Sequence, residues 1–293
     1  MDEEIQRFVG YLENVKKVSR NTVMSYHGDL GKMTAYMKNQ GVCSVDEISA
    51  TLLNSFVLNM ECTGKSAATI SRYIASIKAF FEYLMREHVL EEDPSFFLKA
   101  PKVEKKVPGI LTVQEMEDIL DQPVTDNPKG LRDKAMLELL YATGMRVSEL
   151  VHLEAEDVNL RFGWIICREE GKERMIPFGG TAGRALLEYM DRGRDSFMKK
   201  GQEKLLFLNC SGAPMSRQGF WKVLKSYAAK AGIDKDITPR MFRHSCAAHM
   251  AAGGAGLQII QEMLGYTDMA ATQIYAEFQP GIRKEYSKAH PRG

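Results

Sequence analysis

Two arginines stand three residues apart at the start of an apolar run, in the stretch PRMFRHSCAAHM that covers residues 239–250. On a helix, positions i and i+3 are neighbours, so Arg240 and Arg243 would lie on one face. A planar guanidinium can grip a phosphate or a carboxylate through two hydrogen bonds. The pair therefore indicates an anion site, although arginine pairs on a surface often have no such role.

A third arginine stands at a turn that leads into a helix. Arg146 follows the break at Gly144 in YATGM and precedes the helix-like run VSELVHL. A helix N-terminus carries a partial positive charge that favours anions. Arg146 is thus a further candidate anion ligand, and a weak one when it is taken alone.

The composition is that of a globular protein with no obvious charged partner. The 293 residues leave room for two domains, and 44% are hydrophobic and 26% charged. The net charge is +1, so composition carries no electrostatic signature of a nucleic-acid binder. A DNA-binding surface would therefore require the positively charged side chains to gather on one face of the folded protein.

Apolar runs and cysteine positions indicate where the protein is located and whether it holds a metal or a cofactor. No apolar run approaches the roughly 20 residues of a membrane helix, and the acidic start MDEEIQRF is unlike a signal peptide. The five cysteines are scattered without a C-x-x-C pattern, which argues against a disulfide frame or a zinc site. We therefore expect a cytoplasmic protein with no membrane segment, no metal and no cofactor.

The N-terminal third has the pattern of a compact helical bundle. Apolar residues recur at helical spacing in residues 3–17, 19–41, 44–60 and 66–88. Ser19 and Ser66 are candidate N-caps, and Ser44 with Glu47 three residues later predicts a capping box. Short connections between four helices are typical of a bundle.

Residues 94–108 are rich in proline and lysine and differ from both flanks. Pro94, Pro101 and Pro108 disfavour a helix, which predicts an extended connector. It is either a plain linker or a basic strap that also follows a phosphate backbone. We expect one domain at residues 1–93 and a second at residues 109–293.

The second domain is expected to be mostly helical with a small antiparallel sheet. The β-rich runs GWIICREE and KERMIPF, joined by a turn at Gly171, predict a hairpin. Helical patterns cover residues 112–122, 130–144, 181–198, 216–232, 239–250, 256–266 and 269–278. The fold class is therefore mainly α with a small antiparallel β-sheet (α+β).

Three stretches together resemble the signature boxes of one enzyme family. YATGMRVSELVHL, ITPRMFRHSCAAHM and QEMLGYTDMAATQIYAEF are similar to those of the tyrosine recombinases, the phage-integrase family, and in particular its bacterial Xer type. The resemblance extends over nearly the whole chain. It implies an N-terminal helical core-DNA-binding domain, a linker and a C-terminal catalytic domain.

The resemblance assigns roles to three residues. Arg146 and Arg243 match the arginines that clamp the scissile phosphate, and Tyr275 matches the nucleophile. Phosphoryl transfer builds negative charge on the non-bridging oxygens, which fixed guanidiniums stabilise. The tyrosine forms a 3′-phosphotyrosine ester, and the freed 5′-hydroxyl can attack it later, so strands are exchanged without metal or ATP.

Three supporting positions depart from the family pattern. Arg240 stands where the family usually has histidine, and Tyr266 where it has histidine or tryptophan. Glu169 aligns with the catalytic lysine of the hairpin, which leaves Lys172 as the nearest substitute. Arginine cannot accept the proton of a tyrosine at neutral pH, and we interpret His244 and His249 as structural residues.

The resemblance implies a site-specific DNA recombinase that acts on duplex DNA as a homo- or hetero-tetramer on synapsed sites, with or without a second recombinase subunit. The lost acid and base groups imply a slow enzyme. They leave open an inactive DNA-binding paralogue that occupies a site or supports an active partner. A small-molecule enzyme is a third class, which the lack of a phosphate-cradling glycine-rich loop disfavours.

Overall fold

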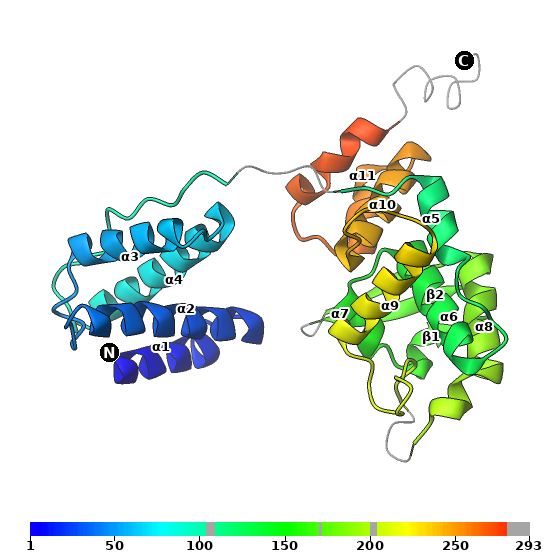
Figure 1. The fold of residues 1–293 in the computed structure, drawn as a ribbon, viewed down its shortest axis with the longest axis horizontal. Coiled ribbons are helices and arrows are strands. Elements are labelled where there is room, and N and C mark those ends of the chain that lie inside the picture. Colours follow the sequence, from blue (N-terminus) through cyan, green and yellow to red (C-terminus); the bar gives the residue numbers. More distant parts are fainter. Residues whose placement is uncertain (104–108, 170–171, 200–203, 280–293) are drawn as a thin grey trace. The chain divides into compact units, whose positions relative to one another are not determined.

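The computed structural model describes residues 1–103, 109–169, 172–199 and 204–279, and the chain divides into two compact units (Figure 1). The first unit is Met1–Lys106 and the second is Val107–Gly293. The predicted linker, residues 94–108, contains this division, and its residues 104–108 lie outside the described part. Leu98, inside the predicted linker, is buried in the core of the first unit.

The first unit is a bundle of four helices. They are α1 (Asp2–Asn14), α2 (Arg20–Asn39), α3 (Ala50–Cys62) and α4 (Ala67–Arg86). Ser19 and Ser66 cap α2 and α4 as expected, because each side chain accepts a hydrogen bond from a backbone N–H three residues later. Phe8, Phe80 and Phe81 are among the apolar side chains that the bundle buries.

The capping box predicted at Ser44 is wrong. The third helix begins at Ala50, where Ser49 accepts a hydrogen bond from the backbone N–H of Leu52. Glu47 instead accepts from the backbone N–H groups of Cys43 and Ser44. The carboxylate therefore closes a turn ahead of the helix. It accepts backbone N–H groups there, as a capping side chain does at a helix start.

The second unit is mostly helical. Its α-helices are α5 (Val113–Leu120), α6 (Pro128–Thr143), α7 (Val147–His152), α8 (Gly180–Arg192), α9 (Arg217–Lys230), α10 (Pro239–Ala252) and α11 (Leu257–Leu264). Its 3-10 helices are η1 (Ala155–Asp157), η2 (Arg194–Phe197), η3 (Met269–Ala271) and η4 (Gln273–Phe278). The α-helix predicted at residues 269–278 is wrong, since η3 and η4, two short 3-10 helices, occupy this stretch.

A three-stranded antiparallel sheet completes the second unit. Its strands are β1 (Val158–Asn159), β2 (Trp164–Glu169) and β3 (Lys172–Pro177), in the order β1-β2-β3. The predicted hairpin is confirmed, with Ile165 opposite Ile176 and Glu169 opposite Lys172. The fold class is thus confirmed as helical with a small antiparallel sheet.

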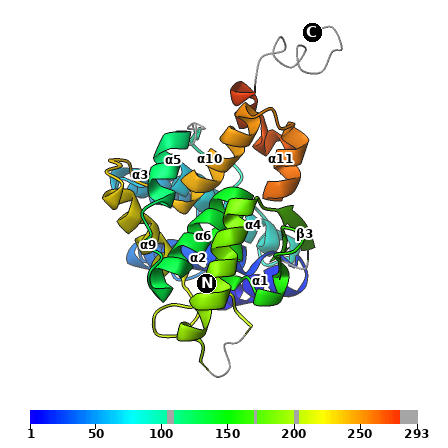
Figure 2. The same ribbon diagram turned by 90° about the vertical axis from the view of Figure 1, so that its right-hand side faces the viewer.

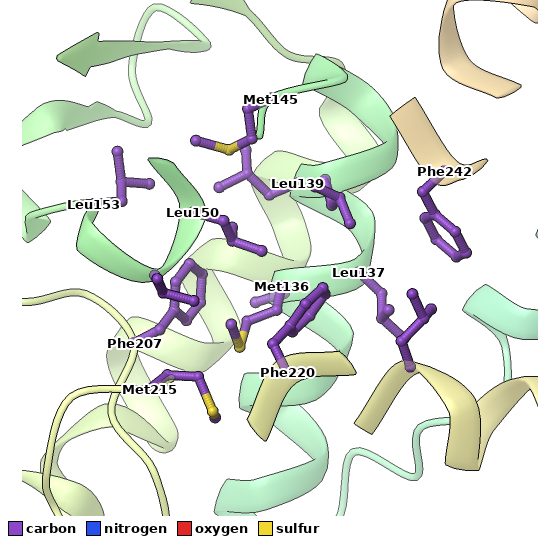
Figure 3. Close-up of a cluster of buried hydrophobic side chains, with 14 of the residues drawn as sticks. Met136, Leu137, Leu139, Met145, Leu150, Leu153, Phe207, Met215, Phe220 and Phe242 are labelled. Carbon is purple, nitrogen blue, oxygen red and sulfur yellow. The ribbon is translucent and has the colours of Figure 1, made fainter. Parts of the chain in front are cut away.

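Helix α6 runs through the core of the second unit. Its side chains Met136, Leu137 and Leu139 are buried among residues of the elements around it, including Phe220 of α9 and Phe242 of α10 (Figure 3). Helix α8 packs along α6, and α11 lies beside α10 (Figure 2). This core fixes the start of α7, α9 and α10 around one cavity.

Candidate active site

Four arginines line one cavity of the second unit. The cavity measures about 360 Å³ and is lined by Met145, Arg146, Val147, Ser148, Arg217, Pro239, Arg240, Arg243 and Tyr266. The cavity brings together Arg146, Arg240 and Arg243 from distant stretches of the chain. It also contains Arg217, which was not predicted from the sequence. No acidic residue is among these described lining residues, so the cavity favours an anion.

Three helices begin at this cavity. Arg146 is the N-cap of α7, Arg217 is the first residue of α9, and Pro239 is the first residue of α10. Helix N-termini present backbone N–H groups and a partial positive charge. The partial positive charge of the helix starts and the charges of the arginines therefore both favour a bound anion, as they do in phosphate sites. A capped helix start is the one sequence signal that could have found Arg217, which follows the cap Ser216.

Arg243 is buried, and backbone carbonyls hold its guanidinium. Nη1 donates to the carbonyl oxygen of Gly144 at 2.8 Å, and Nη2 donates to that of Leu264 at 2.5 Å. The guanidinium also lies over the ring of Tyr266, 4.8 Å from its centroid. These contacts set the orientation of the side chain before any ligand arrives.

A buried carboxylate, Glu149, holds Arg146. Oε2 of Glu149 accepts from the backbone N–H of Arg146 at 2.6 Å, and Oε1 accepts from its Nη1 at 3.2 Å. Arg174 of β3 donates to both carboxylate oxygens, at 2.6 and 2.8 Å. Burial opposes the ionisation of Glu149, but the hydrogen bonds and charges of Arg174 and Arg146 hold its pKa below its usual value.

Glu149 and Arg174 are functional residues that the sequence did not predict. Glu149 stands three residues after Arg146 at the start of α7, which is the spacing of a capping box, and this was the available signal. Arg174 sits on the hairpin, and its contact with Glu149 spans 25 residues of chain. A contact over that separation depends on the tertiary fold.

Two glycines turn the backbone at the helix ends beside the arginines. Gly144, after α6, has φ +58°, and Gly265, after α11, has φ +64°. A Cβ on Gly144 would lie 2.6 Å from Leu264, and one on Gly265 would lie 3.0 Å from the guanidinium of Arg174. Glycine meets both requirements, because it adopts positive φ without steric cost and has no Cβ.

Tyr275, the expected nucleophile, is fully buried on η4 and is not among the residues that line the cavity. Its hydroxyl lies 2.5 Å from Nδ1 of His244. Burial raises the pKa of the Tyr275 phenol strongly, the nearby Tyr266 phenol raises it further, and the charge of Arg243 opposes the shift. Tyr275 therefore lies behind the cavity wall as a neutral phenol.

His244 connects Tyr275 to the cavity through Arg240. Nε of Arg240 donates to Nε2 of His244 at 3.2 Å, while Nδ1 of the same ring faces Tyr275. Burial, followed by the charges of Arg240 and Arg243, lowers the pKa of His244 to about 4, so the ring is neutral at pH 7. We interpreted His244 as a structural residue from the sequence, but the structure places it in contact with the expected nucleophile.

His249 has different surroundings. Nδ1 lies 2.8 Å from the hydroxyl of Tyr141, and Nε2 lies 2.9 Å from the carbonyl oxygen of Leu111. Both partners belong to the framework around α6 and the segment before α5. These contacts agree with the interpretation of His249 as a structural residue.

The hairpin positions Glu169 and Lys172 lie opposite each other in the register of β2 and β3. Their side chains lie outside the described part of the structure. The substitution of Lys172 for the family lysine therefore stays a prediction.

Within the described residues, the structure has no group of three His, Cys, Asp or Glu side chains that could hold a metal ion. Over the same ranges, no helix combines the length and the apolar character needed to cross a membrane.

Comparisons with known proteins place the chain in a family. Residues 110–280 match the phage integrase family, and residues 5–88 match the N-terminal SAM-like domain of phage integrases. The chain is 39% identical to tyrosine recombinase XerD of Staphylococcus haemolyticus and 40% identical to XerD of Staphylococcus aureus. Each alignment spans 294 residues and covers 100% of both proteins.

Solved structures agree in fold. XerH site-specific recombinase bound to a palindromic difH substrate, in a post-cleavage complex, is 21% identical with a TM-score of 0.75, over 99% of this chain and 84% of that one. A lambda integrase dimer bound to a COC′ core site is 15% identical with a TM-score of 0.73, over 95% of each chain. The family models and the alignments with XerD confirm the expected family, and the chain belongs to the phage integrase family of tyrosine recombinases.

Proposed function

We propose that this protein is a site-specific DNA recombinase that cuts and rejoins duplex DNA through a 3′-phosphotyrosine intermediate on Tyr275. The observation that carries the proposal is the cavity in which Arg146, Arg240 and Arg243 meet at the starts of α7 and α10. A phosphodiester is the anion that such a site suits, because guanidiniums match its oxygens in geometry and charge.

The arginines stabilise the charge that develops during attack. Arg243 and Arg146 are held by backbone carbonyls and by Glu149, so little reorganisation is needed when the phosphate becomes pentacovalent. Fixed donors aimed at developing charge are usually the largest single contribution to such catalysis. The ring of Tyr266 packs under Arg243, and its hydroxyl takes the place of the family histidine or tryptophan as a donor to the phosphate.

Tyr275 has to leave its buried position to react. In the structure it lies on a short 3-10 segment, η4, whose hydrogen bonds are poorer than those of an α-helix. A shift of η4 would carry the hydroxyl past Tyr266 toward the phosphate. Attack then forms the bond from the Tyr275 oxygen to phosphorus and releases the 5′-oxygen, for which the sequence offers Lys172 as the candidate proton donor.

The partner is duplex DNA, and we assign DNA contacts to both domains, at residues 1–93 and 109–293, joined by the linker 94–108. Relatives support this assignment. XerH and lambda integrase were solved on DNA, the latter as a dimer, and the integrase of transposon Tn1549 was solved with transposon end DNA. We propose a homo- or hetero-tetramer on two synapsed sites, acting in the cytoplasm where the DNA lies.

The test needs a DNA site, which selection can supply. Tyr275→Phe protein is used to enrich duplexes from a random library, and suicide substrates with a nick next to the selected half-sites are then made. Wild-type protein should form a covalent adduct that survives denaturation, and Tyr275→Phe should form none while it binds the duplex equally well. Duplex binding should weaken steeply with salt, because phosphate contacts dominate it.

Two results would contradict the proposal. An adduct that persists in Tyr275→Phe would move the nucleophile to another residue. Tight duplex binding without any adduct in the wild type would favour the inactive DNA-binding paralogue.

A further inference from the structure

A line of three side chains leads from the cavity to the expected nucleophile. Arg240 lines the cavity and is exposed, His244 is buried behind it, and Tyr275 is buried behind His244. Two contacts join them: Arg240 Nε to His244 Nε2 at 3.2 Å, and His244 Nδ1 to the Tyr275 hydroxyl at 2.5 Å. The histidine therefore touches the atom that would attack phosphorus.

The proton positions in this line follow from the chemistry of arginine. Its Nε–H can only donate, so Nε2 of His244 must be the acceptor. A neutral imidazole has one N–H, which then lies on Nδ1 and points at the oxygen of Tyr275. In this arrangement His244 donates to Tyr275, and so it cannot take the phenol proton.

A phosphate in the cavity would compete for Arg240. A guanidinium bonds more strongly to an anionic phosphate oxygen than to a neutral imidazole, because the opposite charges attract and two parallel N–H···O bonds can form. When Arg240 turns to the phosphate, Nε2 of His244 loses its donor. The ring can then carry its proton on Nε2 and leave a lone pair on Nδ1, facing Tyr275.

We propose that His244 is the proton acceptor for Tyr275, and that Arg240 is a positioning residue that permits this role only when a phosphate occupies the cavity. The proposal rests on the recombinase function proposed above. It gives Arg240 a use that the family histidine at this position would not have, since histidine can itself accept a proton.

The proton balance of the step is simple. With the cavity filled, the Nδ1 proton of His244 exchanges with solvent and one proton is taken up at Nε2, with no net change. The phenol proton moves to Nδ1 while the 2.5 Å contact still holds, before η4 shifts. The Tyr275 oxygen then bonds to phosphorus as the bond from phosphorus to the 5′-oxygen breaks. The departing 5′-oxygen takes a proton from a separate acid, and His244 returns its proton when the ester is resolved.

The first experiment reads the tautomer without any cleavage. The full chain labelled with ¹⁵N-histidine is examined by long-range ¹H–¹⁵N spectra at pH 7, and the His244 signals are identified by their loss in His244→Asn. We expect the Nδ1–H tautomer in the free wild type, and a shift toward Nε2–H in Arg240→Met. Saturating inorganic phosphate should shift the wild type in the same direction and leave Arg240→Met unchanged.

The second experiment reads the proton transfer on the selected suicide substrates. Asn in place of His244 can still donate to Tyr275 but cannot accept a proton, so single-turnover cleavage should fall by about 10²–10⁴-fold. A substrate with sulfur in place of the bridging 5′-oxygen has a leaving group that needs no acid. It should leave the His244→Asn defect unchanged, because the missing group acts on the nucleophile.

Unchanged duplex affinity is the folding control for His244→Asn. An Nε2–H tautomer in the free wild type, or spectra that do not respond to Arg240→Met, would overturn the role of Arg240. Cleavage by His244→Asn within about threefold of wild type, or rescue by the sulfur substrate, would overturn the role of His244. If the wild type itself forms no adduct, the recombinase proposal fails, while the spectra still decide whether Arg240 sets the tautomer.

Discussion

Arg146 and Arg243 are held by consecutive carbonyl groups at one helix end. Nη2 of Arg243 donates to the carbonyl oxygen of Leu264 at 2.5 Å, and Nη2 of Arg146 donates to that of Gly265 at 3.4 Å. The last carbonyls of α11 carry the partial negative charge of a helix C-terminus, which favours cations. The stretch after Met263 thus holds the two arginines next to each other, although 97 residues of sequence separate them.

This arrangement predicts that charge alone will not replace either arginine. Lysine at position 146 or 243 keeps the positive charge but loses the planar fork that reaches a carbonyl and a phosphate at once. Single-turnover cleavage should fall by at least about a hundredfold, as it does when one donor to a developing oxyanion is removed. Duplex affinity should change little, because many phosphate contacts share it.

Arg217→Lys is the matched control, since Arg217 lines the same cavity from the first residue of α9. We expect its cleavage rate to stay closer to wild type than that of Arg146→Lys or Arg243→Lys. Cleavage within about threefold of wild type for both of the latter would contradict the clamp assignment.

Glu149 is expected to stabilise the second unit as well as to position Arg146. Glu149→Gln keeps the shape of the side chain but removes the charge that faces Arg146 and Arg174. Breaking a buried ion pair by removing one partner is costly, and we expect a loss of about 2 kcal/mol in the free energy of unfolding, measured in urea. Cleavage should fall too, because Arg146 loses its anchor.

Glu188→Gln is the control for this change, because Glu188 is exposed on α8. Its free energy of unfolding should stay within about 0.5 kcal/mol of wild type. A Glu149→Gln protein as stable and as active as this control would show that the carboxylate charge is dispensable.

Much of the fold could be predicted from periodicity. Apolar spacing found the four helices of the first unit, and the alternating β-rich runs found the hairpin, because burial patterns are local in sequence. The start of α3 and the 3-10 geometry of η4 were not predicted correctly. Both depend on which backbone groups find partners in the folded chain, as the contact of Glu47 with Ser44 shows.

The site was only partly predictable, for a related reason. The motifs pointed to Arg146, Arg240 and Arg243, and the structure brings these three to one cavity. Helical spacing places His244 about 100° from Arg243 around α10, so the sequence by itself favours a structural role for this histidine. The structure shows that this other face of α10 is where Tyr275 packs, a contact across 31 residues that helical spacing alone cannot reveal.

The substitution Gly265→Ala tests how closely the end of α11 must approach the hairpin. Alanine there would adopt φ +64° at a steric cost and would also place its Cβ 3.0 Å from the guanidinium of Arg174. We expect Gly265→Ala to lose about 2 kcal/mol in the free energy of unfolding and to lower cleavage, since Arg174 would be displaced from Glu149.

Gly232→Ala separates the two causes. Gly232 has φ +71° in the same unit, and a Cβ there would meet no atom within 4 Å, so only the backbone strain remains. Gly232→Ala should therefore cost less stability than Gly265→Ala and leave cleavage unaffected. Equal losses in the two variants would show that the contact with Arg174 has no effect.

The buried His244 predicts a pH dependence of stability. Its pKa in the folded chain is lowered to about 4, mainly by burial and then by Arg240 and Arg243, against about 6.5 in the unfolded chain. Between these values the unfolded chain binds more protons, so the free energy of unfolding falls as pH falls. The stabilisation is complete above about pH 6.5, and up to about 3 kcal/mol is lost by about pH 4.

His244→Asn removes this titration. Urea unfolding of the wild type and of the variant, measured at intervals from pH 7.5 to 4.5, should give a steeper fall for the wild type, with the two curves converging toward acid. His249 also has a pKa lowered by burial, but it is present in both proteins, so its contribution cancels in the difference. If the His244→Asn curve instead runs parallel to that of the wild type, His244 binds as many protons in the folded chain as in the unfolded chain. Folding would then not lower its pKa, and the buried ring would not be held as a neutral group.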